Sequence, residues 1–463
     1  MRHAAEELQH FLREMSGAVL PICDDREEFQ EKSIVLGECR ALDKVGCVYP
    51  DGLGDEGFVL RTVGQTLLIL GSQVRGVLYG VYTLLEKYFG CRWFTPDVSR
   101  IPRSQTLKLC QMDDRQVPVL EYRDPYHTGY LQAADWHARN KCNGNQPPLT
   151  EKHGGKMAYC KYFVHSFDNL VPVEEYFDTH PEYFSEVNGV RVREKTQLCL
   201  TNEDVFQISL ERIRGWIKEN PEARIVTVSV NDCFNPCQCE KCRAVNDREE
   251  SQAGTLIQFV NRLAEEITKE YPDILIDTLS YLYTRKAPKY LHTHPNVIVR
   301  VCTIECCFSH PLEECQAMGS FNLEESARPN FAQDLINWSK CSQRMYVWDY
   351  VTNFENFLQP FPNFKTLQPN LQFYIRNGVK GVFYEGYTTF HECSSGELDQ
   401  MRMYVMAKLL WDPQANVDML VNEFLAGYYG QAAPWMRAYY DLLHKQTENK
   451  EWHLGVYDPP TKP

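Results

Sequence analysis

The stretch "GTLIQFVNRLAEEITKEYPDILIDTLSYL", residues 254–282, joins an amphipathic helix pattern directly to a strand pattern. Between Leu256 and Ile267 apolar residues recur every three or four positions, which is the spacing of a helix with one buried face. After Pro272 the run "ILIDTLSYL" is mostly apolar, as is typical of a strand buried on both faces of a sheet. A helix that leads into such a strand indicates an α/β protein with a parallel sheet.

The same alternation recurs along most of the chain. Eight short apolar runs with helical patterns between them can be counted after residue 118. They are "VLEYRDPY", "KMAYCKYFVHSF", "TQLCLTN", "RIVTVSVND", "DILIDTLSYL", "VIVRVCTIEC", "RMYVWDY" and "VKGVFYEGY", near residues 120, 160, 198, 228, 277, 301, 347 and 383. Eight repeats over residues 118–463 predict a (β/α)8 TIM barrel.

Residues 1–112 have a different pattern of helices and short strands, which predicts a small α+β accessory domain. A helix is expected over residues 4–15, followed by short strands, of which two form a hairpin around Gly64, and by a second helix over residues 75–89. The segment carries few polar groups suited to chemistry, which favours a structural or docking role.

Composition and charge restrict the function. The net charge of −14 disfavours binding to nucleic acid or to anionic membranes, and a glycan or a neutral or cationic small molecule fits better. No run reaches the roughly 18 apolar residues of a membrane helix. The opening "MRHAAEELQHFLREMSG" has no signal-peptide core, so the sequence as it stands predicts a cytoplasmic protein, and a secreted one if its start has been lost.

In a barrel the catalytic groups lie at the C-terminal ends of the strands. Here these ends carry carboxylates, amides and aromatic rings, the combination that sugar chemistry needs. Asp232, Glu385 and Asp349 are the candidate catalytic residues, although each also fits a structural role. The candidate substrate contacts are Arg139, Asn140, Asn143, His165, Asn231, Tyr281, Glu305, His310, Trp348, Tyr350 and Tyr387. Neither a "GxxxxGKS" phosphate loop nor a "GxSxG" elbow is present.

The loop after Asp232 is rich in cysteine. "CFNPCQCEKC", residues 233–242, contains Cys237, Cys239 and Cys242, which could supply three ligands to a structural zinc ion, with Cys233 or a distant thiol as the fourth. A disulfide or packed free thiols in a reducing compartment are the alternatives. In each case we expect the loop to brace Asp232, and no cofactor is required for the chemistry.

Several motifs together resemble known families. "AAEELQHFLREMSGAVLPI" and "RGVLYGVYTLLEKYFGCRWFTPD" resemble the accessory domain that precedes the barrel in family 20 hexosaminidases and α-glucuronidases. The rest resembles the bacterial domain of unknown function 4838, through "HPEYFSEVNGVR", "QLCLTNEDV", "VNDCFNPCQCEKC", "CCFSHPLEEC", "VWDYVTNFENFLQPFPN", "GVKGVFYEGY" and "AKLLWDP" with "EFLAGYYG". Members of that group include endo-β-N-acetylglucosaminidases that act on complex N-glycans. In relatives the accessory domain usually begins with a strand before the "AAEEL" helix, and this sequence lacks it.

The resemblance implies a glycoside hydrolase for β-linked N-acetylglucosaminides, with retaining hydrolysis in which the acetamide of the substrate attacks the anomeric carbon. The hexosaminidases carry an Asp-Glu pair after the fourth strand, where this chain has Asn231-Asp232, so the roles do not transfer directly. Asp232 is then one catalytic carboxylate and Glu385 the other acid/base candidate. Two alternatives stay open: a hydrolase for another glycoside such as an α-glucuronide, which would need additional basic residues, and a non-catalytic glycan-binding barrel.

Overall fold

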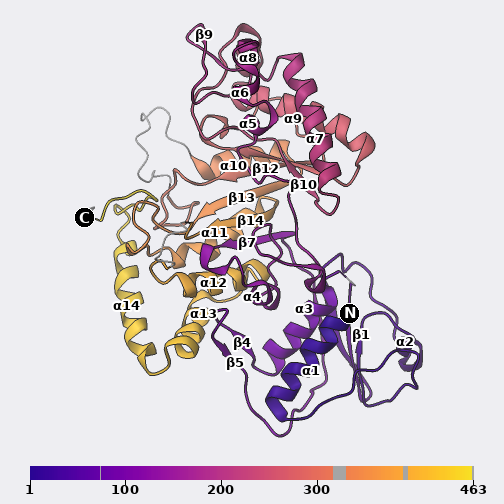
Figure 1. Cartoon of the computed structure of the whole chain (residues 1–463). Coiled ribbons are helices and arrows are strands. Elements are labelled where there is room, and N and C mark those ends of the chain that lie inside the picture. The colour runs from indigo at the N-terminus through magenta and orange to yellow at the C-terminus, as the bar shows by residue number, and fades with distance from the viewer. Residues whose placement is uncertain (73, 316–329, 389–394, 461–463) are drawn as a thin grey trace. The chain divides into compact units, whose positions relative to one another are not determined.

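The computed structural model describes residues 1–72, 74–315, 330–388 and 395–460 (Figure 1). These residues form two compact units. Unit 1 comprises Met1–Lys156 and Tyr387–Leu443, and unit 2 comprises Met157–Gly386 and His444–Pro463. The units do not follow the predicted domain boundary between residues 112 and 118, because the chain enters unit 2 only after residue 156 and returns to unit 1 at residue 387.

Unit 1 is built around a mixed sheet of four strands in the order β1 (Ile34–Leu36), β3 (Thr66–Gly71), β2 (Phe58–Val63) and β6 (Asp113–Gln116). The predicted hairpin is confirmed, since β2 and β3 pair antiparallel on either side of Gly64, whose φ of 59° suits a tight turn. The predicted first helix is also confirmed as α1 (Arg2–Ser16), which ends at Gly17 in the left-handed conformation.

The remaining elements of unit 1 are mainly helical. The second predicted helix begins as α3 (Gly76–Thr83) and packs with α1. The other elements are α2 (Ala41–Val45), β4 (Arg92–Trp93), β5 (Ser99–Arg100), β7 (Tyr122–Tyr126), α4 (Ala134–Arg139), α12 (Asp399–Trp411), α13 (Val417–Phe424) and α14 (Ala433–Lys445), the last of which runs past the end of unit 1.

Unit 2 contains the parallel sheet. Five of its strands lie side by side in chain order: β10 (Ile225–Thr227), β11 (Leu275–Ser280), β12 (Val297–Cys302), β13 (Met345–Tyr350) and β14 (Val379–Glu385) (Figure 1). All four pairs between them are parallel. The connection from β10 to β11 contains α8 (Glu240–Glu249) and α9 (Ala253–Glu270), that from β12 to β13 contains α10 (Phe331–Cys341), and that from β13 to β14 contains α11 (Phe364–Arg376). The connection from β11 to β12 contains a 3₁₀ turn, Leu282–Thr284, and no α-helix.

Residues 254–282 fold as their pattern predicts. α9 turns Leu256, Phe259, Val260 and Leu263 inward, and β11 is buried at every position. Burial of one such apolar side chain contributes about 1.5–3 kcal/mol. Asp277 is the single acid of β11. It forms an ion pair with the guanidinium of Arg300 at 2.9 Å, so its buried charge is compensated.

Six of the eight predicted strands exist as β7 and β10–β14, whereas the runs near residues 160 and 198 form no strand. Their contacts of sheet type are isolated bridges, such as Tyr159 with Ile225. In the first of these runs, positive φ angles of 63° at Lys161 and 52° at His165 interrupt the extended backbone. The chain is thus a mixed α/β protein with a parallel sheet, and a closed eight-stranded barrel is not confirmed.

Shorter elements fill the segment that these two runs occupy. They are α5 (Phe167–Leu170), α6 (Val173–Tyr176), β8 (Glu186–Val187), β9 (Val190–Arg191) and the longer α7 (Glu203–Glu219). Asn202 caps α7, since its side-chain oxygen accepts from the backbone amides of Asp204 and Val205.

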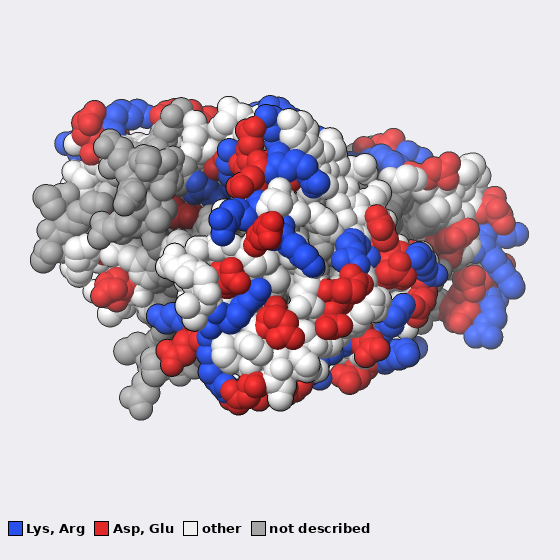
Figure 2. All heavy atoms as spheres, turned by 90° about the horizontal axis from the view of Figure 1, so that it is seen from above, with Lys and Arg blue, Asp and Glu red and all other residues white. Residues whose placement is uncertain are grey.

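Acidic and basic side chains are interspersed on the face drawn in Figure 2, and the residues coloured there form no continuous basic patch. None of the described helices is long and apolar enough to cross a membrane.

Candidate active site

Two carboxylates at strand ends of unit 2 each accept a hydrogen bond from an aromatic side chain. Asp232 lies in the loop after β10, and its Oδ1 accepts from the hydroxyl of Tyr281, 3.0 Å away, at the end of β11. Glu385 is the last residue of β14, and its Oε2 accepts from the indole Nε1 of Trp348 on β13, 2.8 Å away. The end of the sheet thus holds two oriented acids.

The charge of Asp232 acts on Glu385. Burial raises the pKa of Glu385 to about 7; the Trp348 indole works against this shift and the negative charge of Asp232 adds to it. Burial and the charges of Glu385 and Asp232 also raise the pKa of Tyr457. Asp232 is exposed and Glu385 is partly buried, so both are open to solvent.

Aromatic rings lie beside these carboxylates. Trp348 and Tyr350 stack with ring centroids 6.1 Å apart, and Phe383 meets Trp348 edge to face at 4.9 Å. The register explains the grouping, because Trp348 pairs with Phe383, and Tyr350 pairs with Glu385, so that all four side chains share one face of the sheet. Such rings can pack against the C–H faces of a sugar.

Asp349 lies on the opposite face of β13 and does not join this group. Its Oδ1 accepts from the Thr303 hydroxyl at 2.7 Å and its Oδ2 from the Tyr374 hydroxyl of α11 at 2.9 Å. Burial raises its pKa to about 6, although these hydrogen bonds partly oppose the shift. Because side chains alternate along a strand, Asp349 cannot share a face with Trp348 and Tyr350. We therefore remove Asp349 from the candidate catalytic set.

Glu305 and Asn231 also differ from their predicted role as sugar contacts. Glu305 is buried and forms an ion pair with Arg285 at 3.3 Å. Asn231 uses its side chain within the protein: Nδ2 donates to the Thr196 carbonyl at 3.0 Å, and Oδ1 accepts from the amide of Asp168 at 3.1 Å. These contacts give both residues structural roles.

His310 is buried in a cluster of potential metal ligands. Its Nε2 lies 3.1 Å from the carbonyl of Thr447, and its Nδ1 lies 3.6 Å from the sulfur of Cys307. Cys315 and His453 complete the cluster, whose ligand atoms all lie within 4.8 Å of one another. This environment does not support the predicted contact of His310 with substrate.

Four of the predicted contacts lie inside unit 1. Arg139 forms an ion pair with Glu7 at 3.1 Å, and Asn140 donates to the Trp93 carbonyl at 3.3 Å. Asn143 donates to Glu56 Oε1 at 2.7 Å, and the Tyr387 ring stacks on that of His127 with centroids 5.3 Å apart. Glu56 also pairs with the buried guanidinium of Arg123 at 2.7 Å. These polar groups hold the interior of unit 1 together.

His165 contacts the ring of Tyr281, which donates to Asp232, and the charges of Glu385 and Asp232 act on Tyr457. The His165 ring is 5.9 Å from that of Tyr281, and its Nδ1 donates to the carbonyl of Val230 at 2.8 Å, so that Nε2 faces away from this bond. The predicted contact of His165 with a sugar hydroxyl is compatible with this placement. The sequence reasoning missed Tyr457, because it lies near the C-terminus and follows no strand.

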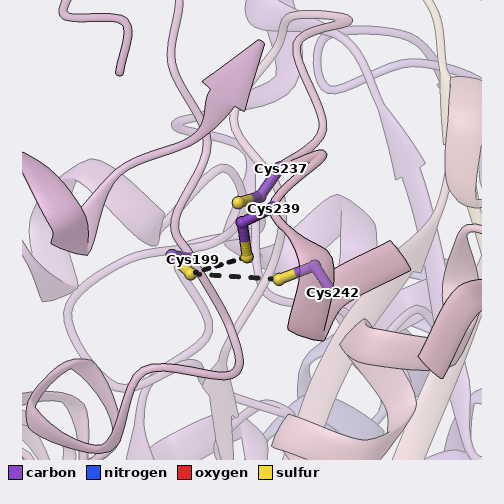
Figure 3. Close-up of side chains that lie close together, drawn as sticks. All are labelled: Cys199, Cys237, Cys239 and Cys242. Carbon is purple, nitrogen blue, oxygen red and sulfur yellow. Dashed lines mark hydrogen bonds between the residues drawn. The ribbon is translucent and has the colours of Figure 1, made fainter. Parts of the chain in front are cut away.

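Three cysteines of the loop after β10 meet a fourth. The sulfurs of Cys237, Cys239 and Cys242 group with that of Cys199, and all four lie within 4.8 Å of one another (Figure 3). Cys233 is not part of this group, since its sulfur lies near the Gln197 side chain and the Thr196 carbonyl.

The hydrogen bond from Trp348 gives a direct prediction. Because the indole stabilises the ionised form of Glu385, Trp348→Phe should raise the pKa of Glu385 above its present value of about 7. The shift can be measured by NMR titration of protein labelled with ¹³C-glutamate, with the resonance assigned through Glu385→Gln. Trp338→Phe, whose indole donates to the Arg285 carbonyl, is the matched control and should leave the titration unchanged. A lower pKa in Trp348→Phe would contradict the assignment.

Comparison with known proteins places the chain in a sequence family. Residues 93–441 match the family described as "Domain of unknown function (DUF4838)", and residues 1–84 match the family described as "Glycosyl hydrolase family 67 N-terminus". The comparison with curated proteins gave no match.

Solved structures of glycoside hydrolases with TM-scores above 0.5 share the fold. A family GH115 4-O-methyl-α-glucuronidase with specificity for decorated arabinogalactans is 11% identical with a TM-score of 0.57, and the match covers 96% of this chain and 60% of that one. A family GH138 enzyme that targets pectin rhamnogalacturonan II is 11% identical with a TM-score of 0.52, over 95% of this chain and 53% of that one. A mutant Streptomyces plicatus β-hexosaminidase bound to GlcNAc is 11% identical with a TM-score of 0.48, and the match covers 94% of this chain and 88% of that one.

The chain therefore spans about 60% or less of the length of the first two enzymes, and the likeness to them is one of fold. The predicted relation to domain of unknown function 4838 is confirmed by the match of residues 93–441, and residues 1–84 match a glycosyl hydrolase N-terminal domain. The predicted relation to endo-β-N-acetylglucosaminidases is not confirmed.

Proposed function

Because the chain belongs to the family described as domain of unknown function DUF4838, we propose that it is a glycoside hydrolase that cleaves β-linked N-acetylglucosaminides in glycans. One observation carries the proposal: Asp232 and Glu385 interact at one end of the parallel sheet, and their surroundings differ. Glu385 is partly buried with its pKa raised to about 7, whereas Asp232 is exposed. A pair of carboxyl groups with distinct environments is what glycoside hydrolysis requires.

Glu385 acts as the general acid. With a pKa of about 7 it is substantially protonated at neutral pH, and its proton passes to the glycosidic oxygen as the bond to the anomeric carbon breaks. The indole of Trp348 fixes the orientation of the carboxyl group through its 2.8 Å hydrogen bond. After the leaving group departs, the ionised carboxylate takes a proton from the incoming water.

Asp232 stabilises the acetamide of the substrate, which is the nucleophile. In a retaining mechanism with substrate assistance, the acetamide oxygen attacks the anomeric carbon and the amide nitrogen becomes positively charged. The Asp232 carboxylate accepts the N–H hydrogen bond and stabilises this charge, while the Tyr281 hydroxyl holds the carboxylate in place at 3.0 Å. His165 and Trp348 contact the hydroxyl groups and the apolar face of the sugar.

A second candidate is hydrolysis of an α-glucuronide, which the likeness of fold to the family GH115 4-O-methyl-α-glucuronidase favours. A uronic acid carries a carboxylate, and its binding calls for Arg or Lys at the site. In the described part of unit 2, the charged neighbour that shifts the pKa of Glu385 is Asp232, and neither acid forms an ion pair with a basic side chain. This favours a substrate without a carboxylate. A non-catalytic glycan-binding protein would have no need of a carboxyl group with a pKa near 7.

The proposal is tested by incubation with aryl glycosides and N-glycoproteins, with mass spectrometry of the released sugars. We expect release of N-acetylglucosaminides and competitive inhibition by a thiazoline analogue of N-acetylglucosamine, because this analogue mimics the cyclised intermediate. Turnover of a glucuronide without inhibition by the thiazoline would support the second candidate. Glycan binding without any turnover would indicate a lectin-like protein.

A further inference from the structure

We propose that Cys199, Cys237, Cys239 and Cys242 bind one Zn²⁺ ion as a structural site. The four thiols come from two parts of the chain: Cys199 lies within the run near residue 198, and the other three belong to the loop after β10 and the first turn of α8. Their sulfur atoms point toward one another (Figure 3). Every member is buried, with 9% exposure or less.

The distances fit a tetrahedral thiolate site. The Cys199 sulfur lies 3.7 Å from that of Cys239 and 3.9 Å from that of Cys242, and no two of the four sulfurs are more than 4.8 Å apart. A zinc ion holds its sulfur ligands at about 2.3 Å, so that two ligands of a tetrahedron are separated by about 3.8 Å. The spacing is thus close to that of a loaded site.

The geometry does not favour disulfides within this group. A disulfide joins two sulfurs at about 2.05 Å and leaves other thiols outside the bond. Here the Cys199 sulfur is nearly equidistant from two different partners, Cys239 and Cys242. A shared ion satisfies both contacts at once, whereas a covalent bond would satisfy one.

Polar groups around the cluster support thiolates. The backbone amide of Glu186 lies 3.4 Å from the Cys237 sulfur, the Arg191 guanidinium lies 3.7 Å from the same atom, and the Thr201 hydroxyl lies 3.2 Å from the Cys242 sulfur. Donors of this kind orient metal-bound ligands and stabilise their negative charge. Arg191 also compensates part of the net charge of four thiolates with one Zn²⁺.

A site with four protein ligands is closed, so the ion has no open position for substrate and its role is structural. It would fasten the loop after β10 to the segment that contains Cys199. Asp232 lies in the same loop, before the three cysteines, so the ion also restricts the position of Asp232. This last role rests on the proposed function, whereas the metal site itself does not.

Metal content tests the site without any assay of activity. Protein purified without chelator is analysed by inductively coupled plasma mass spectrometry, together with Cys199→Ser, Cys242→Ser and Cys233→Ser. We expect the first two variants to contain one zinc equivalent less than the parent and to melt at a lower temperature. Cys233→Ser is the matched control from the same loop and should keep the zinc of the parent. The difference between variant and parent is the readout, because His310 and its neighbours form another group of potential ligands.

A second measurement uses the parent chain, in case a variant does not fold. Titration with a mercurial reagent in the presence of a chromogenic chelator should release zinc as thiols react, and cobalt(II) in place of zinc should give the thiolate-to-metal absorption of a tetrahedral site. Iron in place of zinc, disulfides among the four cysteines found by peptide mapping, or equal zinc in parent and Cys199→Ser would each overturn the proposal.

Discussion

Glu385→Gln should lower kcat for N-acetylglucosaminides with poor leaving groups by about 10²–10⁴-fold, the usual contribution of a general acid. Glutamine keeps the shape of the side chain and can still meet the Trp348 indole through its amide oxygen, but it has no proton to donate at neutral pH. The parent enzyme should lose activity above pH 7, because the protonated form of Glu385 is the active one and its pKa is about 7. The alkaline limb of the kcat profile should be absent in the variant.

The leaving group distinguishes loss of acid catalysis from general damage. A dinitrophenyl leaving group departs without protonation, so the defect of Glu385→Gln in the bond-breaking step should be much smaller for it than for an alkyl or glycan leaving group. Asp349→Asn is the control, since it alters a buried carboxyl group on the other face of β13. We expect that variant to be less stable but to keep the dependence on leaving group and the alkaline limb. Equal losses for all leaving groups in Glu385→Gln would contradict the role as acid.

The periodicity of the sequence was sufficient to predict most strands of the parallel sheet. The predicted closure of the sheet into an eight-stranded barrel is not confirmed. Runs such as residues 273–282 are mostly apolar, and the strand that they form is buried at every position. The run that contains Lys161 and His165 has a similar composition, yet two positive φ angles break it. Such angles depend on tertiary contacts, which the composition of a short window does not record.

The two acids of the candidate site were predicted because strand ends of parallel sheets converge. Asp349 was grouped with them, although the alternation along "MYVWDY" places it on the other face from Trp348 and Tyr350. The alternation of side chains shows that β13 has two faces. It does not show which face carries the candidate site, because both faces are buried. The pairing of Asp349 with Tyr374 of α11 decides this point.

The spacing of residues in the sequence could not predict contacts between segments that are far apart in the chain. Asn140 and Asn143 follow a predicted strand and have the chemistry of sugar ligands, yet their partners Trp93 and Glu56 lie far away in the sequence. In the same way, the loop of residues 233–242 indicated three possible metal ligands, and the fold was needed to identify Cys199 as the fourth.

Asp232→Asn should lower kcat for N-acetylglucosaminides by about 10²–10³-fold, the usual loss when one group that stabilises a developing charge is removed. The amide that replaces the carboxylate carries no negative charge to balance the acetamide nitrogen as it becomes positive. The variant should also bind the thiazoline analogue more weakly. Because the charge of Asp232 helps to raise the pKa of Glu385, its removal should move the alkaline limb to lower pH, opposite to the shift expected for Trp348→Phe.

Two further variants separate the charge of Asp232 from its position. Tyr281→Phe removes the 3.0 Å hydrogen bond and keeps the carboxylate, so we expect a smaller loss of kcat than in Asp232→Asn. Asp168→Asn changes another exposed acid of unit 2 and should have the activity of the parent. If Asp232→Asn retained the parental kcat and affinity for the thiazoline, the carboxylate would have no part in the reaction, and the mechanism with acetamide assistance would lose its stabilising group. An unchanged kcat combined with a shifted alkaline limb would instead limit Asp232 to an electrostatic effect on Glu385.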